Sequence, residues 1–265
     1  MKNDKKLVFI KFGGSVITDK GKEEKADNDS IKSLAKQLSD VKTKDQNLSI
    51  LVGTGAGSFG HIQVKKYKLE GGISTEKQKL GFALIEDSVS RLNQMVVAEL
   101  LKSRISAVSM KPSSMFTTES GSIKYFFLDA LLGFINMGIT PVLYGDMVYD
   151  SQVGGAVLST DRIFYELANI FSKQNIVIDR VVFCGSTNGV LDRNGKTIKK
   201  ITVKNLSEYS DVFFDNKFVD VTGGMKKKVM TALWISKLGI PCRIIGRDSL
   251  ESCLLEDKFE GTIIE

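Results

Sequence analysis

The sequence is poor in several residues from which functional sites are often built. Its only histidine is His61, and its three cysteines, Cys184, Cys242 and Cys253, match no metal-binding spacing. An odd number of irregularly spaced cysteines indicates reduced thiols rather than a disulfide framework or a zinc site. We therefore expect a cytoplasmic protein whose side chains form no dedicated metal site.

Long apolar runs are also missing. Residues 1–6 are mostly charged, and the apolar run after them is interrupted by Lys11. We therefore expect neither a signal peptide nor a membrane span. The formal charge is +6, but the lysines are scattered and are not interleaved with aromatic residues as in RNA-binding modules. We expect no nucleic-acid partner, and a modest positive field would instead speed the capture of phosphorylated small molecules.

Strand-like apolar runs alternate with amphipathic helical segments along the chain. This alternation predicts an α/β fold with a central, mainly parallel sheet covered by helices on both faces. The 265 residues contain no internal repeat and no proline-rich linker, so we expect a single domain over 1–265. In such sheets ligands bind beyond the carboxyl ends of the strands. Here those ends carry glycine at positions 13–14, 55–57, 145, 185, 223–224 and 246.

The glycine turn over 55–61 reads Gly-Ala-Gly-Ser-Phe-Gly-His, between a predicted strand at 48–52 and a helical segment at 62–68. A strand, a glycine turn and a helix direct backbone N–H groups at an anion. The turn fits G-x-G-x-x-G, so a dinucleotide site is one interpretation, and a plain packing turn is another. A P-loop is excluded, because His61 and Ile62 stand where lysine and Ser/Thr are needed. So many glycine-bearing strand ends favour two phosphorylated ligands that face each other.

Charged side chains accompany the other glycine turns. Lys11 ends a predicted buried strand, where its ammonium group is costly unless it meets an anion. Lys20 lies beyond the first turn, and Lys228 lies in the second turn of a helix that opens at residues 223–224. Asp161 starts another helix, as an N-cap or as an ion-pair partner of these lysines. Phosphoryl transfer needs such charge stabilisation and little covalent chemistry from the protein.

With these motifs the chain resembles the amino acid kinase superfamily and, within it, the isopentenyl phosphate kinases. The resemblance rests on residues 10–20, 55–61, 81–84, 107–113, 141–146 and 220–228. The turn that ends in His61 is the discriminating piece. Relatives that phosphorylate amino acids lack this histidine, whereas isopentenyl phosphate and fosfomycin kinases carry it.

The resemblance implies the three-layer amino acid kinase fold, a homodimer, and ATP-dependent phosphorylation of isopentenyl phosphate to isopentenyl diphosphate by in-line transfer in isoprenoid biosynthesis. The acceptor monophosphate would lie over an N-terminal lobe of about 1–178, and ATP with Mg²⁺ over a C-terminal lobe of about 179–265. The implied catalytic residues are Lys11, Lys20, His61, Asp161 and Lys228. The implied acceptor-binding residues are Gly55, Ala56, Gly57, Gly60, His61, Ser159 and Thr160. The implied ATP-binding residues are Lys11, Gly13, Gly14, Ser15, Gly185, Ser186, Gly189, Gly223, Gly224 and Lys228. The implied walls of the prenyl pocket are Phe82, Ile85, Val89 and Met137.

Three positions depart from the family pattern. Thr160 stands where the family commonly has glycine, Thr54 replaces a histidine, and the turn at 185–189 lacks two acidic residues. The pattern Ser-Xaa-Asp-Arg, completed by Arg162, is shared with fosfomycin kinase. A fosfomycin-type kinase of small phosphonates or phosphates is therefore the alternative within the class. An NAD(P)-binding oxidoreductase that uses residues 55–60 and a non-catalytic nucleotide sensor are the alternatives from other classes.

Overall fold

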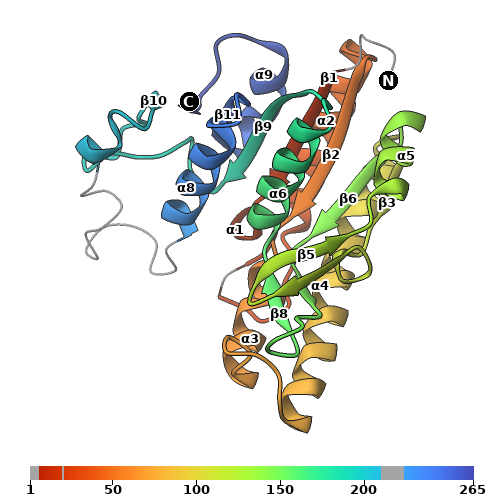
Figure 1. The fold of residues 1–265 in the computed structure, drawn as a ribbon. Helices are drawn as coiled ribbons and strands as arrows, with labels where there is room; N and C mark the ends of the chain where they lie inside the picture. The colour runs from red at the N-terminus through yellow and green to blue at the C-terminus, as the bar shows by residue number, and fades with distance from the viewer. Residues whose placement is uncertain (1–5, 20, 210–223) are drawn as a thin grey trace.

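The computed structural model describes residues 6–19, 21–209 and 224–265 (Figure 1). Two predicted site residues, Lys20 and Gly223, lie outside the described residues, and Gly223 is the first residue of the helix opening predicted at 223–224. The strands are β1 (Lys6–Phe12), β2 (Leu48–Thr54), β3 (Ala107–Ser109), β4 (Phe116–Glu119), β5 (Ser122–Phe126), β6 (Thr140–Tyr144), β7 (Asp146–Val148), β8 (Ala156–Leu158), β9 (Ile178–Gly185), β10 (Lys200–Ile201), β11 (Cys242–Gly246) and β12 (Gly261–Ile264). The α-helices are α1 (Gly14–Ile17), α2 (Asn28–Lys44), α3 (His61–Tyr67), α4 (Glu76–Lys102), α5 (Asp129–Met137), α6 (Thr160–Lys173), α8 (Gly224–Ser236) and α9 (Leu250–Leu255).

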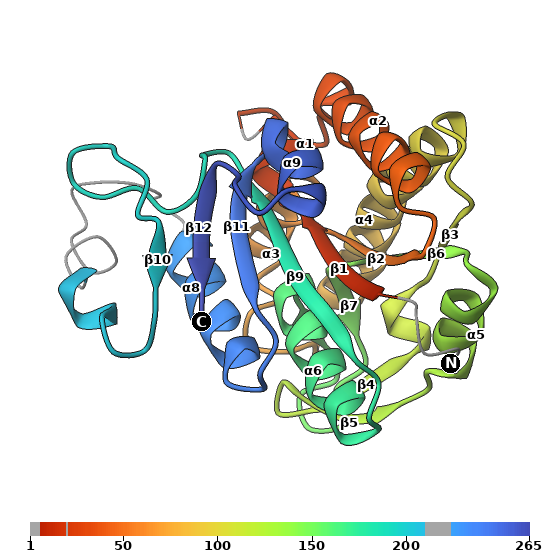
Figure 2. The same ribbon diagram turned by 90° about the horizontal axis from the view of Figure 1, so that it is seen from above.

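A single large sheet forms the middle layer of the molecule. Its eight strands run in the order β10-β12-β11-β9-β1-β2-β6-β3, and every pairing is parallel except that of β11 with β12. Helices α2, α4 and α9 cover one face, and α5, α6 and α8 cover the other (Figure 2). The predicted α/β fold, with a mainly parallel sheet between two helical layers, is therefore confirmed.

The central strand β1 shows why these residues form the core. Its side chains alternate between the two faces, so that Leu7 and Phe9 join one apolar cluster while Val8 and Ile10 join the other. The Phe9 ring packs 5.2 Å from that of Phe164 on α6. Because β1 lies between β2 and β9 and all three run parallel, their carboxyl ends meet at one edge of the sheet.

The first half of α4 reaches beyond that carboxyl edge. The Asn93 amide donates to the carbonyls of Val142 (3.5 Å) and Leu143 (3.3 Å) on β6, so the later half of the helix packs on the sheet. The earlier half projects past the strand ends beside α3 and the β7–β8 hairpin (Figure 1). Strands β7 and β8 pair antiparallel to form this hairpin. Among the described residues, no helix is long and apolar enough to span a membrane.

Candidate active site

The first and second glycine turns form one structure at the carboxyl edge. A Cβ built on Gly14 would overlap the backbone nitrogen of Gly57, and a Cβ on Gly55 would overlap that of Gly14. The hydroxyl of Thr18 joins the turns: it donates to Gly14 O (2.7 Å) and accepts from Ser58 N–H (3.0 Å). The two motifs therefore require glycine because their backbones touch, and Thr18 is a linking residue that the sequence motifs did not single out.

The hydrogen bonds of the second turn show which amide groups can face an anion. Gly55 N–H donates to Phe12 O at 2.9 Å, so this amide is already used by the sheet. The N–H groups of Ala56 and Gly57 have no acceptor among the residues that the structure describes. His61 follows as the exposed first residue of α3. The amides of Ala56 and Gly57 are therefore available to an anion, whereas Gly55 provides close backbone approach.

Lys11 and Asp161 meet at the same edge. Lys11 Nζ lies 2.6 Å from Asp161 Oδ2, and the two side chains are only 10% and 19% exposed. The anion that a lysine at the end of a buried strand requires is thus the carboxylate at the start of α6. The other carboxylate oxygen, Asp161 Oδ1, is buried without a hydrogen-bond partner in the described part of the chain.

Ser159 and Thr160 hold the start of α6 in place. Ser159 is the N-cap, and its hydroxyl accepts from Arg162 N–H at 3.3 Å. The Thr160 hydroxyl donates to Thr54 O at 2.6 Å, which fastens the helix to the end of β2. Both predicted acceptor-binding residues thus use their hydroxyls to position Asp161. The departure from glycine at position 160 introduces this fastening contact.

Lys228 approaches the site from α8. The residue is 9% exposed, and a Cβ built at Gly185 would lie 2.9 Å from its Nζ. Gly13 N–H donates to Cys184 O at 3.0 Å, so the first glycine turn is fastened to the same strand end. Gly224 begins α8, Ser186 follows β9, and Gly189 has a φ of +98°. Lys11 and Lys228 therefore lie at the carboxyl ends of the adjacent strands β1 and β9.

The four residues predicted to line the prenyl pocket do not all lie on the same side of the molecule. Phe82, Ile85 and Val89 lie on the projecting half of α4, and Val89 Cγ1 would lie 3.4 Å from a Cβ at Gly60. Met137 is 71% exposed at the end of α5, immediately before β6 begins. It therefore lies at the amino edge of the sheet, opposite the site, and its prediction as a pocket wall was wrong. The helical pattern of α5 could not tell which end of the sheet Met137 would reach.

Asp146 is a buried carboxylate within the sequence motif at 141–146, and no role was predicted for it. It follows β6 and is 2% exposed, and its oxygens accept from Ser113 N–H (2.9 Å) and Met147 N–H (2.8 Å). Burial raises the pKa of Asp146 to about 6, with a smaller contribution from the negative charge of Glu86, although the two hydrogen bonds lower it. Asp146 thus ties the turn after β3 to the end of β6.

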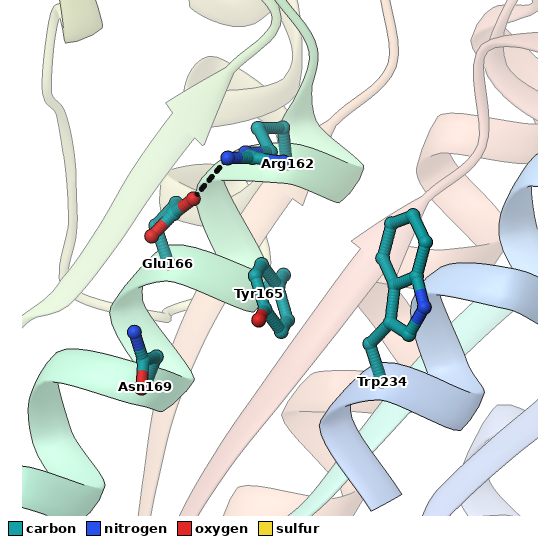
Figure 3. Close-up of a pocket in the computed structure, with 5 residues that line it drawn as sticks. All are labelled: Arg162, Tyr165, Glu166, Asn169 and Trp234. Carbon is teal, nitrogen blue, oxygen red and sulfur yellow. Dashed lines mark ion pairs between the residues drawn. The ribbon is translucent and has the colours of Figure 1, made fainter. Parts of the chain in front are cut away.

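A shallow groove of about 330 Å³ runs along the outer faces of α6 and α8 (Figure 3). Arg162 Nη2 pairs with Glu166 at 2.6 Å, and the rings of Tyr165 and Trp234 lie 5.8 Å apart. Asn169 completes the lining. None of the predicted site residues lines this groove, and Arg162 pairs there with Glu166.

Comparison with known proteins agrees with this geometry. The model of the amino acid kinase family matches residues 6–246. The isopentenyl phosphate kinases of Methanothermobacter thermautotrophicus and Haloferax volcanii are each 31% identical to the chain, and each alignment covers 97% of the chain and 98% of the relative. A solved isopentenyl phosphate kinase structure superposes with a TM-score of 0.75 at 28% identity, over 97% of this chain and 100% of that one. The chain therefore belongs to the amino acid kinase family and is a phosphotransferase.

Proposed function

We propose that the chain transfers the γ-phosphoryl group of ATP to isopentenyl phosphate and releases isopentenyl diphosphate and ADP, a step of isoprenoid biosynthesis. The observation that carries this proposal is the meeting of the His61 turn with the Lys11–Asp161 pair at one edge of the sheet. An anion-binding turn that ends in histidine suits a phosphate acceptor. The isopentenyl group of the acceptor is inferred from the isopentenyl phosphate kinases to which the chain is similar.

The proposed transfer needs little proton chemistry. An oxygen of the acceptor phosphate forms the new bond to the γ-phosphorus while the bond from that phosphorus to the β–γ bridging oxygen breaks, and ADP leaves with the electron pair. The acceptor is already an oxyanion near neutral pH, so no strong general base is required. The protein has to position both phosphates and to offset their charge.

Each site residue then has a role in the proposal. Lys11 and Lys228 stabilise the donor phosphates and the group in transfer, and Asp161 holds Lys11. The amides of Ala56 and Gly57, with His61, bind the acceptor phosphate. Lys20, outside the described residues, would bridge donor and acceptor. In this arrangement ATP lies over the C-terminal lobe, about 179–265, and the acceptor lies over the N-terminal lobe, about 1–178. The turns at 13–15 and 185–189 surround the ATP phosphates.

Mg²⁺ belongs to the proposal as a partner of ATP. Among the described residues, no cluster of three or more His, Cys, Asp or Glu side chains could hold a metal ion. Mg²⁺ in kinase sites is commonly held by substrate phosphates, water and one or two carboxylates. Asp161 Oδ1, which is buried and has no hydrogen-bond partner among the described residues, fits that need. When bound, Mg²⁺ would neutralise charge on the ATP phosphates. A homodimer and a cytoplasmic location complete the proposal on the basis of the family resemblance.

The test is turnover with defined acceptors. The purified protein with ATP, Mg²⁺ and isopentenyl phosphate should yield ADP, followed by a coupled assay, and a diphosphate visible by ³¹P NMR. Fosfomycin as acceptor, and NAD⁺ binding without ATP, are the comparison conditions. Turnover of fosfomycin but not of isopentenyl phosphate would refute the proposed acceptor, and NAD⁺ binding without ATP binding would refute the kinase assignment.

A further inference from the structure

Three segments form a projection beyond the carboxyl edge of the sheet, on the side of the His61 turn. They are α3, residues 76–90 of α4 and the β7–β8 hairpin, and we term them the overhang (Figure 1). The base of the overhang is attached to the rest of the molecule: Ser88 Oγ donates to Phe59 O at 2.9 Å, and Lys111 Nζ pairs with Glu86 Oε1 at 2.6 Å. Its outer part, around Ile73 and the β7–β8 loop, is held by contacts among loops and with the neighbouring β4–β5 hairpin.

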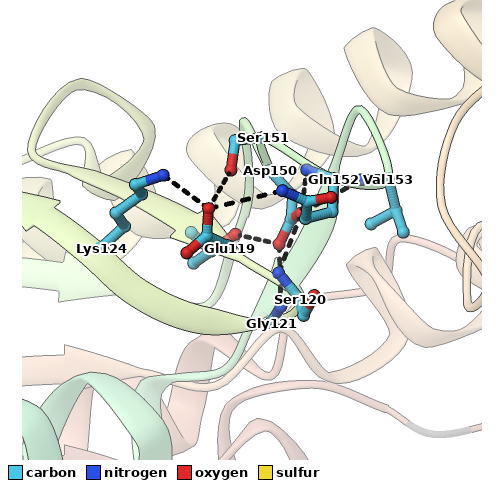
Figure 4. Close-up of polar contacts among 9 residues, drawn as sticks. Glu119, Ser120, Gly121, Lys124, Asp150, Ser151, Gln152 and Val153 are labelled. Carbon is cyan, nitrogen blue, oxygen red and sulfur yellow. Dashed lines mark hydrogen bonds and ion pairs between the residues drawn. The ribbon is translucent and has the colours of Figure 1, made fainter.

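Asp150, between β7 and β8, is the centre of those contacts (Figure 4). The residue is fully buried. Its carboxylate accepts five hydrogen bonds, from Thr118 Oγ1 (2.8 Å), Ser120 N–H (3.1 Å), Gly121 N–H (2.8 Å), Gln152 N–H (2.9 Å) and Val153 N–H (3.2 Å). Burial alone would raise the pKa of Asp150, but the donors outweigh it and hold the pKa well below its ordinary value. The carboxylate is thus ionised and joins the turn of the β4–β5 hairpin to the loop of the β7–β8 hairpin.

The loop that Asp150 organises also supports the start of α4. Val153 O accepts from Ile73 N–H at 2.7 Å. A Cβ built at Gly155 would overlap Ile73 Cδ1 and would lie 3.1 Å from the Phe82 ring. Because Gly155 has no side chain, the loop lies directly against Ile73 and against Phe82 of α4. A change in the loop after Asp150 would therefore move Ile73 and Phe82.

Phe82 begins a stripe of α4 that leads to the glycine turn. Phe82, Ile85 and Val89 follow one another at helical spacing, and Val89 packs at Gly60, next to His61. If the acceptor phosphate binds at the His61 turn, as the proposed function requires, its organic tail can lie along these three side chains. The tail would end at Phe82, Ile73 and the loop after Asp150.

We propose that Asp150 is a positioning residue that fixes the far wall of the acceptor-tail site and so sets the tail length that the enzyme accepts. The inference rests on the proposed function for the nature of the tail. Asp150 itself touches neither phosphate in this arrangement. It acts through Val153, Gly155 and Ile73, and its removal should alter selection of the acceptor and leave ATP binding unchanged.

Two substitutions remove the carboxylate to different extents. Asp150→Ala removes all five acceptor contacts. Asp150→Asn keeps one oxygen, so it can retain the donors of either Oδ1 or Oδ2 but not both. We expect the ratio of kcat/KM for isopentenyl phosphate to that for geranyl phosphate, which has a ten-carbon tail, to fall at least tenfold in Asp150→Ala and by less in Asp150→Asn. The KM for ATP should stay within twofold of the wild-type value.

The matched control is Asp45→Ala. Asp45 Oδ1 also accepts a backbone N–H, that of Asn47 (3.1 Å), but in the loop before β2 at the opposite edge of the sheet. Even if Asp45→Ala lowers the thermal stability, it should keep the wild-type ratio of kcat/KM values for the two acceptors. An unchanged acceptor ratio in folded Asp150→Asn and Asp150→Ala, or an equal rise in the KM values for ATP and acceptor, would overturn the inference.

Hydrogen exchange gives a readout that does not depend on activity. The Ile73 N–H, bonded to Val153 O, should exchange at least tenfold faster in Asp150→Asn than in the wild type, while exchange in the core strand β1 stays unchanged. Unchanged protection at Ile73 would overturn the inference. If the wild type fails to phosphorylate isopentenyl phosphate, the proposed function fails, and the exchange experiment still tests the support that Asp150 gives to Ile73.

Discussion

Breaking the Lys11–Asp161 ion pair should destabilise the protein strongly, because removal of one partner leaves a mostly buried charge unpaired. Unit charges 2.6 Å apart attract by about 6 kcal/mol at an effective dielectric of about 20, before the loss of hydration is subtracted. Removal of one partner from a buried pair costs about 3–5 kcal/mol. Asp161 is 19% exposed, so we expect Asp161→Asn to cost about 3 kcal/mol, at the lower end of that range. For a chain of this size, such a loss lowers the thermal midpoint by about 6–12 °C.

Differential scanning calorimetry without nucleotide measures this loss, and Glu76→Gln, in an exposed ion pair, is the matched control. The Lys79–Glu76 pair has a similar separation of 2.7 Å, but its side chains are 61% and 89% exposed. An exposed pair contributes about 0–1 kcal/mol, so this control should move the midpoint by about 4 °C at most. Equal shifts in the two variants would refute the argument from burial. In the double mutant Lys11→Met/Asp161→Asn, part of the stability should return, because no unpaired charge remains buried.

Three further outcomes follow from the site. Lys20→Ala and Lys228→Ala should each lower kcat at least about tenfold, the scale of a lost charge-assisted contact of about 1.4 kcal/mol. The control Lys227→Ala, at an exposed position of the same helix as Lys228, should leave kcat unchanged. Wild-type kcat in the first two variants would contradict the proposed roles. His61→Ala should raise the KM for the acceptor and spare that for ATP, and the reverse result would mean that the two ligand sides are exchanged. The folded-state pKa of Asp146, about 6, lies above its ordinary value of 3.8, so its stabilising contribution is full below about pH 4 and is lost as the pH rises through about 6. Asp146→Asn should remove that part of the pH dependence of the free energy of unfolding, and equal pH profiles for variant and wild type would contradict the assignment.

The fold was predictable where side-chain burial leaves a periodic pattern. Strands β1, β2, β6 and β9 are buried over nearly their whole length, and continuous apolar runs marked all of them. The β4–β5 hairpin was missed because four of the five residues of β5 are exposed. An exposed strand of this kind, ending at Tyr125 and Phe126, lacks the alternation that reveals a half-buried strand.

The site was predictable as a set of residues, but not as a set of contacts. The glycine motifs and Lys11 stood out because glycine and a buried lysine are locally unusual. The pairing of Lys11 with Asp161 was one alternative among several for a helix-capping aspartate, and only the tertiary structure selects it. Asp150 gave no signal at all, since an aspartate followed by polar residues is typical of any surface turn. Its donors from the β4–β5 turn lie about thirty positions away in the chain.

The two sides of the site are held by different means, and this difference has a consequence for how the enzyme can change. The groups that would bind the phosphates are attached to the ends of β1, β2 and β9 and to the starts of α6 and α8, so the core of the molecule fixes them. The outer part of the overhang is held by loop hydrogen bonds centred on Asp150 and by glycine contacts at Gly155. Because contacts confined to loops can be altered without disturbing the sheet, acceptor preference should vary among related chains more readily than the phosphoryl-transfer chemistry. Substitutions at Asp150 and around it should therefore separate the two properties in a single protein.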